Sequence, residues 1–183
     1  MVQMTEDNGY TQLAFTERVS LGLAWDFGLG SRLDLDASMI AYDSEYNELT
    51  VVDYCQKVGF GGAIQHSGDN RTGEGEGDDE VINLDFAAIP PKVLRIACVV
   101  NCFSKKNLSS AKHAYVRLFM GPYTLGVQQL TKVCKSVGML FCFLQRNSHG
   151  AWFFRTVVEP VSGNTARDSS SEVADILCKI PLF

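Results

Sequence analysis

Residues 33–42 read LDLDASMIAY, and apolar and polar side chains alternate along this segment. In an extended chain, successive side chains point to opposite faces. Leu33, Leu35 and Ala37 would therefore share one face, and Asp34, Asp36 and Ser38 the other. This period of two predicts a β-strand that carries two carboxylates on one side.

Comparable segments occur on both sides of this strand. Alternating or continuous apolar runs bounded by turn residues predict further strands at 18–25, 49–55, 81–86, 93–103, 114–120, 136–146 and 151–158. The segment 123–130 is a weaker candidate, and Asn147–Gly150 would close a hairpin. The glycine-rich stretch 59–77 has no period and predicts a loop. Many short strands with few, short helices favour an all-β fold, a two-sheet β-sandwich.

The two ends of the chain differ from this central part. We expect an N-terminal extension at 1–17, the sandwich domain at 18–158, and a linker with a short C-terminal tail at 159–183. The segment 159–171, EPVSGNTARDSSS, is polar and predicts the linker. The tail SEVADILCKIPLF has helical spacing at Val173, Ile176 and Leu177, with Ser171 as its N-cap.

Composition limits the classes of function. The chain has 183 residues, 46% of them hydrophobic, which suits one domain of ordinary size. Its net charge of -5 gives no general attraction to phosphate backbones, so nucleic-acid binding is not expected. No apolar run is long enough for a transmembrane segment. The polar start, MVQMTEDNGYTQ, lacks the pattern of a secretory signal, which predicts a cytoplasmic protein.

Six cysteines are scattered along the chain without a CxxC pair. Cys98 and Cys102 would share a face of one apolar strand. We favour reduced, buried thiols in an intracellular core, and a zinc site is the minor alternative.

Residues 69–80, DNRTGEGEGDDE, concentrate six acids around one base, Arg71. Glycines interleaved with the acids allow tight curvature, so carboxylates and backbone carbonyls can converge. Oxygen donors without His or Cys suit a hard cation, and calcium accepts 6–8 oxygens in flexible geometry. Asp34 and Asp36 would supply a second wall. The alternative is a solvated acidic surface loop.

Two common loop designs do not fit these residues. Aligning Asp69 and Glu80 with the ends of an EF-hand loop puts Arg71 and Gly73 at ligand positions and Glu74 where glycine is required. A phosphate-binding loop needs GxxxxGK[ST], which is absent, and six acids would repel phosphate. Any calcium site here would therefore have another architecture.

Three motifs together resemble the TerD family of tellurium-resistance and stress-response proteins: LGLAWD at 21–26, DLDAS at 34–38 and HSGDNRTGEGEGDDE at 66–80. Ile89-Pro90 and the aromatic strand AWFFRTVV at 151–158 also fit. The resemblance covers roughly residues 18–158. The family usually has Asp where this chain has Glu76, and neither the N-terminus nor the tail 159–183 matches it well.

The resemblance implies a sandwich that binds calcium, usually two ions, at one end. Carried over by position, the candidate metal ligands are Asp26, Asp34, Asp36, Asp69, Asn70, Glu74, Glu76, Asp78, Asp79 and Glu80. Arg71, Thr72 and His66 would brace the loop. We therefore expect a non-enzymatic calcium-binding module in stress response or signalling. The alternative is a scaffold subunit of a larger assembly, with a protein partner and calcium structural or lost; a hydrolase has only the acid cluster in its favour.

Overall fold

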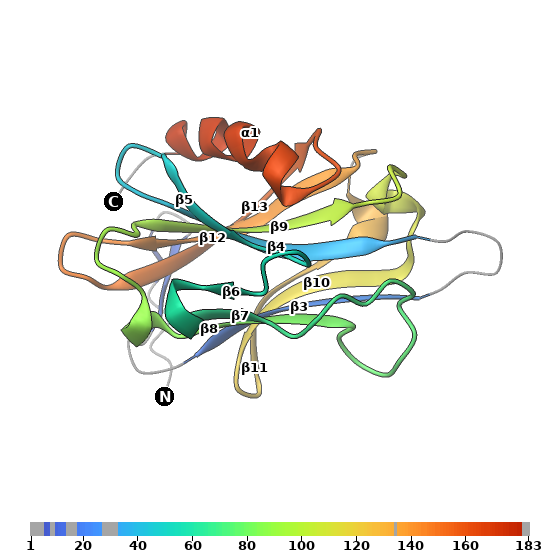
Figure 1. Cartoon of the computed structure of the whole chain (residues 1–183), viewed down its shortest axis with the longest axis horizontal. Coiled ribbons are helices and arrows are strands. Elements are labelled where there is room, and N and C mark those ends of the chain that lie inside the picture. Colours follow the sequence, from blue (N-terminus) through green and yellow to red (C-terminus); the bar gives the residue numbers. More distant parts are fainter. Residues whose placement is uncertain (1–5, 8–9, 14–17, 27–32, 134, 181–183) are drawn as a thin grey trace.

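The computed structural model describes residues 6–7, 10–13, 18–26, 33–133 and 135–180. Within these residues the chain forms two antiparallel sheets packed face to face (Figure 1). The first has the strand order β1-β2-β13-β12-β9-β4-β5, and the second has the order β11-β10-β3-β8-β7-β6. The predicted all-β, two-sheet sandwich is confirmed.

The strands of the first sheet are β1 (Glu6–Asp7), β2 (Tyr10–Leu13), β4 (Leu35–Tyr42), β5 (Glu48–Val52), β9 (Arg95–Cys102), β12 (Gly138–Arg146) and β13 (Trp152–Val161). Those of the second are β3 (Val19–Asp26), β6 (Val58–Gly59), β7 (Ile64–His66), β8 (Glu80–Leu84), β10 (Lys112–Met120) and β11 (Tyr123–Gln129). Short 3-10 turns occupy Phe60–Gly62, Phe86–Ala88, Leu108–Ser110 and Leu130–Lys132, and one α-helix, α1, spans Ala166–Cys178.

The main core lies between the sheets. The inner face of β4 contributes Leu35, Ala37 and Met39, and β3 contributes Leu21 and Leu23 from the opposite sheet; all five are completely buried. Burying a side chain of leucine size stabilises the fold by roughly 2 kcal/mol. The alternation predicted for 33–42 is confirmed, and it leaves Asp36 and Ser38 on the other face of β4.

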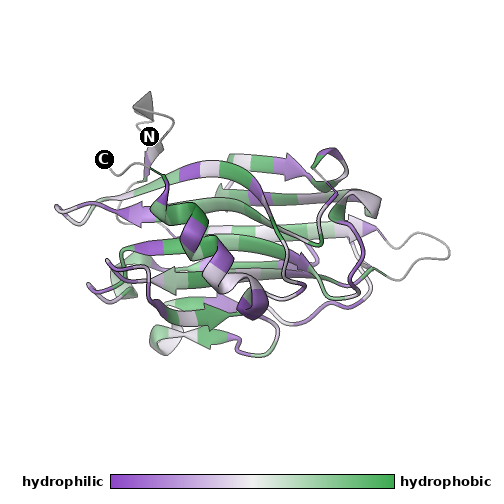
Figure 2. Ribbon diagram, turned by 90° about the horizontal axis from the view of Figure 1, so that it is seen from above, coloured by the Kyte–Doolittle hydropathy of each residue, from purple (hydrophilic) through white to green (hydrophobic). Residues whose placement is uncertain are grey.

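A second apolar cluster fills the space between the first sheet and α1. Figure 2 looks onto the helix, which crosses the strands obliquely. Val173 and Leu177 pack there against the outer face of the sheet, including Ile40 and Tyr42 of β4. The Tyr42 hydroxyl donates to the Ser170 carbonyl oxygen at 2.8 Å. These contacts hold the C-terminal segment on the sheet.

The predicted linker at 159–171 is not seen as such. Its first residues complete β13, and its last residues begin α1. The N-cap is Thr165, not Ser171 as predicted, because its side chain accepts a hydrogen bond from the Asp168 amide. Ser169 and Ser170 are buried, so the serine run that resembles a linker is a small-residue helix face close to the sheet. The domain limits themselves stay a prediction.

The stretch 59–77 is only partly a loop, so this prediction was wrong in its first half. It contains the end of β6, a 3-10 turn, and β7. In β7, Ile64 and His66 are buried and Gln65 is exposed. A strand of three residues repeats the period too few times to be found from sequence.

The cysteine prediction is confirmed in part. Cys98, Cys102 and Cys142 are free and buried in the main core, but Cys55 and Cys178 are free and exposed; Cys134 lies outside the described residues. Among the helices that the structure describes, none has the length and apolar character needed to cross a membrane.

Candidate metal centre

Two of the predicted ligands come from the start of β4. Asp36 is only 4% exposed and lies on the strand face opposite Leu35 and Ala37. Asp34 directly precedes the strand and is half-buried. Because residues two apart on a strand share a face, both carboxylates point to the same region, as predicted.

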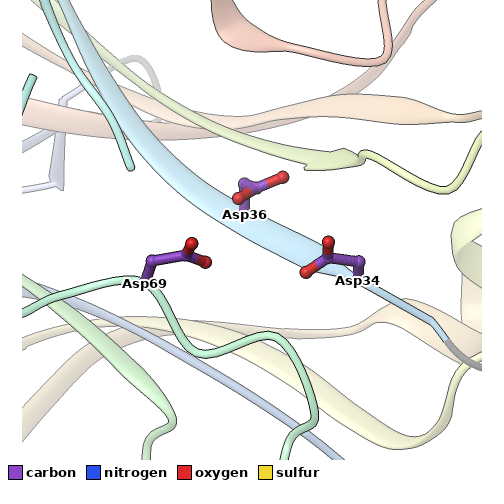
Figure 3. Close-up of side chains that lie close together, drawn as sticks. All are labelled: Asp34, Asp36 and Asp69. Carbon is purple, nitrogen blue, oxygen red and sulfur yellow. The ribbon is translucent and has the colours of Figure 1, made fainter. Parts of the chain in front are cut away.

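Asp69 approaches this pair from the loop that joins β7 to β8 (Figure 3). One carboxylate oxygen from each of Asp34, Asp36 and Asp69 lies within 4.8 Å of the other two. Figure 3 shows the three side chains facing a common region beside β4. We call these three residues the aspartate cluster. It joins a strand of one sheet to a loop of the other.

Two oxygens of the aspartate cluster are buried without a hydrogen-bond partner: Oδ1 of Asp34 and Oδ2 of Asp36. Burial, with the charges of Glu80 and Asp34 next in size, raises the pKa of Asp36 to about 8. Burial and the charge of Asp69 also raise the pKa of Asp34, against the opposing effect of Arg71. Buried acceptors without donors are costly, so these atoms suit a bound cation.

Glu80 lies behind the aspartate cluster and is completely buried. Its Oε2 accepts from the Ala37 amide at 2.8 Å, and its Oε1 accepts from the Asn70 amide at 3.1 Å. On its β5 side, β4 is paired only over Met39–Tyr42, which leaves the Ala37 amide without a strand partner. The Glu80 carboxylate accepts a hydrogen bond from this amide instead. Glu80 therefore fixes the spacing between β4 and the acidic loop.

His66 lies beside Glu80 at the end of β7, and its Nε2 has no hydrogen-bond partner among the described residues. The His66 Nδ1 accepts from the Gly68 amide at 3.0 Å, so in the neutral ring the proton lies on Nε2. That nitrogen is 3.4 Å from Glu80 Oε2, and both side chains are fully buried. The supporting role expected for His66 agrees with this geometry.

Asn70 organises the acidic loop through hydrogen bonds. Its Oδ1 accepts from the amides of Thr72 and Gly73, both at 3.0 Å, and its Nδ2 donates to Asp79 Oδ1 at 3.0 Å. The second Asp79 oxygen accepts from the Trp25 amide at 2.9 Å. Both predicted ligands thus already serve to hold the loop against β3.

Asp78 faces away from the aspartate cluster. It forms a two-pronged ion pair with Arg117 of β10, in which Arg117 Nη2 lies 2.8 Å from Asp78 Oδ2. The carboxylate lies over Gly22 of β3, where a Cβ would overlap it. The glycine of the LGL motif therefore makes room for this anchor.

Three other predicted ligands are exposed in this structure: Asp26, Glu74 and Glu76. None of them belongs to the aspartate cluster.

Gly73, which directly precedes Glu74, brings the loop close to β3. Its φ is +63°, and a Cβ there would overlap the Trp25 carbonyl oxygen. This close approach folds the loop onto β3, and the Trp25 indole Nε1 donates in turn to the Leu33 carbonyl at 3.1 Å.

The sequence pointed to neither Asp53 nor its partner Arg167. Asp53 follows β5, is buried, and pairs with Arg167 of α1 at 3.0 Å. Its charge also contributes to the raised pKa of Asp36, as the last of five causes. An isolated Asp in the run VVDYC carries no pattern, so only the fold could bring it beside the metal centre.

The residues around the aspartate cluster lie within a segment that matches a known protein family. The model of the TerD domain family matches residues 9–167. The chain belongs to the TerD family. The recognition made from the three motifs is therefore confirmed.

Relatives of this TerD-family chain carry resistance and stress names. It is 30% identical to the tellurium resistance protein TerZ of Serratia marcescens, over 95% of this chain and 93% of that protein. It is 33% identical to general stress protein 16U of Bacillus subtilis, over 55% and 58%. The crystal structure of a TerD homologue from Streptomyces coelicolor superposes with a TM-score of 0.79, at 23% identity, over 87% of this chain and 98% of that one, which supports the sandwich fold.

Proposed function

We propose that the protein is a calcium-binding module of the stress response, with its ion held by Asp34, Asp36 and Asp69. One observation carries this proposal: the buried Asp36 carboxylate has an oxygen without a partner, and it faces two further carboxylates. Asp36 belongs to β4 and Asp69 of the acidic loop is exposed, so this observation supports a cation at the strand carboxylates and leaves Glu74 and Glu76 as solvated acids.

Electrostatics favour a cation in the aspartate cluster. Two ionised carboxylates at 4.8 Å repel by roughly 3 kcal/mol at an effective dielectric constant of about 20. Three such pairs would be strongly unfavourable, and in the protein without an ion this repulsion adds to burial, the main cause, in raising the pKa of Asp36. A divalent cation removes this repulsion and replaces the proton.

The donor chemistry favours calcium over other metals. The aspartate cluster offers carboxylate oxygens alone, which suits hard cations and not zinc or copper. Carboxylates on a strand and on a loop suit the larger, more flexible shell of calcium better than the strict octahedron of magnesium. A second ion, expected from the family resemblance, stays a prediction.

A binding role is proposed in place of catalysis. The names of the relatives describe resistance and stress response and specify no reaction. We infer that calcium joins β4 to the acidic loop and stiffens this end of the sandwich. The cytoplasmic location expected from the sequence stays a prediction.

Calorimetric titration with calcium and magnesium tests the proposal directly. We expect calcium to bind with higher affinity than magnesium, and the stoichiometry distinguishes one ion from two. Calcium should also raise the melting temperature relative to chelator, because a ligand that binds only the folded state stabilises it. Equal melting temperatures in excess calcium and in EGTA would reject calcium binding.

A scaffold subunit is the second candidate. The edge strand β11 exposes Tyr123 and Val127, at 63% and 58%, which favours a contact with a protein partner. Size-exclusion chromatography with light scattering, in calcium and in EGTA, distinguishes the two. An assembly that persists unchanged in chelator supports the scaffold, and a monomer in both conditions argues against it.

A further inference from the structure

Two aromatic rings lie beside the aspartate cluster. Tyr54 follows β5 and Phe103 follows β9, and their rings meet edge to face with centroids 5.8 Å apart. Because β5 and β9 flank β4, the ring pair crosses β4 near its acidic start. The Phe103 amide donates to the Asp34 carbonyl at 2.9 Å, which places Phe103 next to Asp34.

The Tyr54 side of this ring pair is partly buried. Phe103 nevertheless remains 43% exposed. Other large aromatics, such as Trp25 and Trp152, are buried in the core. The exposed ring of Phe103 thus offers an apolar contact surface at the edge of the metal centre.

A guanidinium lies on the acidic-loop side of the centre. The Arg71 side chain is 72% exposed, and its Nε lies 3.9 Å from Asp69 Oδ2, too far for a good hydrogen bond. Asp69 belongs to the aspartate cluster, so this contact places the guanidinium beside the cluster. A bound calcium ion would weaken this attraction, because it neutralises the carboxylates. The planar fork of Arg71 would then be available to an anion.

We propose that the centre binds an oxyanion ligand with an apolar body. Its phosphate or carboxylate group completes the calcium shell and contacts Arg71, and its apolar body packs against Phe103. This inference rests on the proposed calcium binding and identifies the ligand class of the same site. Calcium takes 6–8 oxygens, and three monodentate carboxylates supply fewer. Without calcium, the aspartate cluster repels the anion, so binding depends on the ion.

Phenyl phosphate is the probe, because it joins a phosphate to one aromatic ring. We expect it to bind the calcium-saturated protein in calorimetric titration and to bind at least about tenfold more weakly in EGTA. Inorganic phosphate should bind more weakly than phenyl phosphate, because it lacks the apolar contact, and phenol should not bind. Replacing Arg71 by alanine should weaken phenyl phosphate binding about tenfold, and Phe103→Ala about three- to tenfold.

Matched controls come from residues remote from the centre. Arg18 is 76% exposed beside Asp85, and Tyr123 is exposed on β11. Arg18→Ala and Tyr123→Ala should leave the affinity for phenyl phosphate unchanged. Each variant is titrated with calcium first, so that every comparison is made at calcium saturation.

The outcomes separate this inference from the proposed function. If the wild-type protein does not bind calcium, both the proposed function and the oxyanion site are rejected. If the protein binds calcium normally but does not bind phenyl phosphate, only the oxyanion site is overturned. The same holds if Arg71→Ala and Phe103→Ala both bind phenyl phosphate as tightly as the wild type does. The protein can also be sedimented with vesicles of phosphatidylglycerol and phosphatidylcholine, or of phosphatidylcholine alone. Sedimentation that needs phosphatidylglycerol, calcium and Phe103 supports the site and identifies its anion as a lipid headgroup.

Discussion

The start of β4 and the start of β8 both carry neighbouring acids, and the fold uses them differently. In the first region Asp36 is buried and Asp34 is half-buried, and each has one carboxylate oxygen that is buried without a hydrogen-bond partner. Asp78, Asp79 and Glu80 of the second have their oxygens engaged by a guanidinium or by amides. The first region therefore suits a cation, and the second assembles the loop that brings Asp69 to it. An acidic motif by itself does not distinguish a ligand from an anchor.

Removal of the central ligand should have the largest effect. Asp36→Asn keeps the shape of the side chain and removes its charge, so calcium affinity should fall roughly 100-fold or more, about 3 kcal/mol. Calorimetric titration measures the loss. Circular dichroism should show an intact fold. An unchanged affinity would mean that the ion is bound elsewhere.

The melting temperature without calcium should depend on the charge of Asp36. Its pKa is about 8 in the folded protein against an ordinary value of 3.8, so the folded state holds a proton that the unfolded state releases. The stabilising effect of this proton is complete below about pH 4 and is lost as pH rises through about 8. The melting temperature in EGTA should therefore fall by roughly 10–20 °C over this range.

Thermal melts of the wild type and Asp36→Asn, recorded in EGTA across this pH range, isolate this effect. The wild type should lose stability relative to the variant as pH rises, and saturating calcium should abolish the difference in slope. Parallel curves for the two proteins in EGTA would contradict a buried, protonated Asp36.

The contact of the acidic loop with β3 can be broken at Gly73. An alanine there would combine positive φ with overlap on Trp25, so Gly73→Ala should destabilise the protein by roughly 2–4 kcal/mol. Gly77 also has positive φ but open space around it, so Gly77→Ala should cost only about 1 kcal/mol. Urea denaturation measures both. Equal losses of unfolding free energy in the two variants would show that the Gly73–Trp25 contact does not contribute to stability.

Asp78 tests whether the second region anchors the loop without binding the ion. Asp78→Ala should destabilise the fold by roughly 1–2 kcal/mol, since Arg117 is partly solvated, and lower the melting temperature by about 3–6 °C. Calcium affinity should change by about twofold or less. A double-mutant cycle with Arg117→Met should assign the loss to the ion pair. A large loss of calcium affinity at unchanged stability would instead make Asp78 a ligand.

The smallest effect is expected at Glu76. Its side chain is exposed and outside the aspartate cluster, so Glu76→Gln should alter calcium affinity by about twofold or less. Calorimetry under the conditions used for Asp36→Asn gives the comparison. A tenfold loss would show that the loop closes on the ion and brings Glu76 to it.

Much of the fold follows from local sequence pattern. The period of two in LDLDASMIAY predicted both the strand and its faces, and the longer apolar runs predicted β9, β12 and β13. The short strands β1, β2, β6 and β7 and the N-terminus of α1 were missed. In β7 the period repeats too few times, and in α1 buried serines mimic a linker. Both elements form because tertiary contacts stabilise them, through pairing with β8 and packing on the first sheet.

For the metal centre, the sequence by itself determined the chemistry: oxygen donors, negative charge, glycines that permit curvature, and two aspartates on one face of a strand. Tertiary structure decided how each acid is used. It placed Asp69 opposite Asp34 and Asp36, paired Asp78 with Arg117, and buried Glu80 between β4 and the loop. The physical reason is that the use of a carboxylate depends on its burial and its partners, and these come from residues distant in the chain.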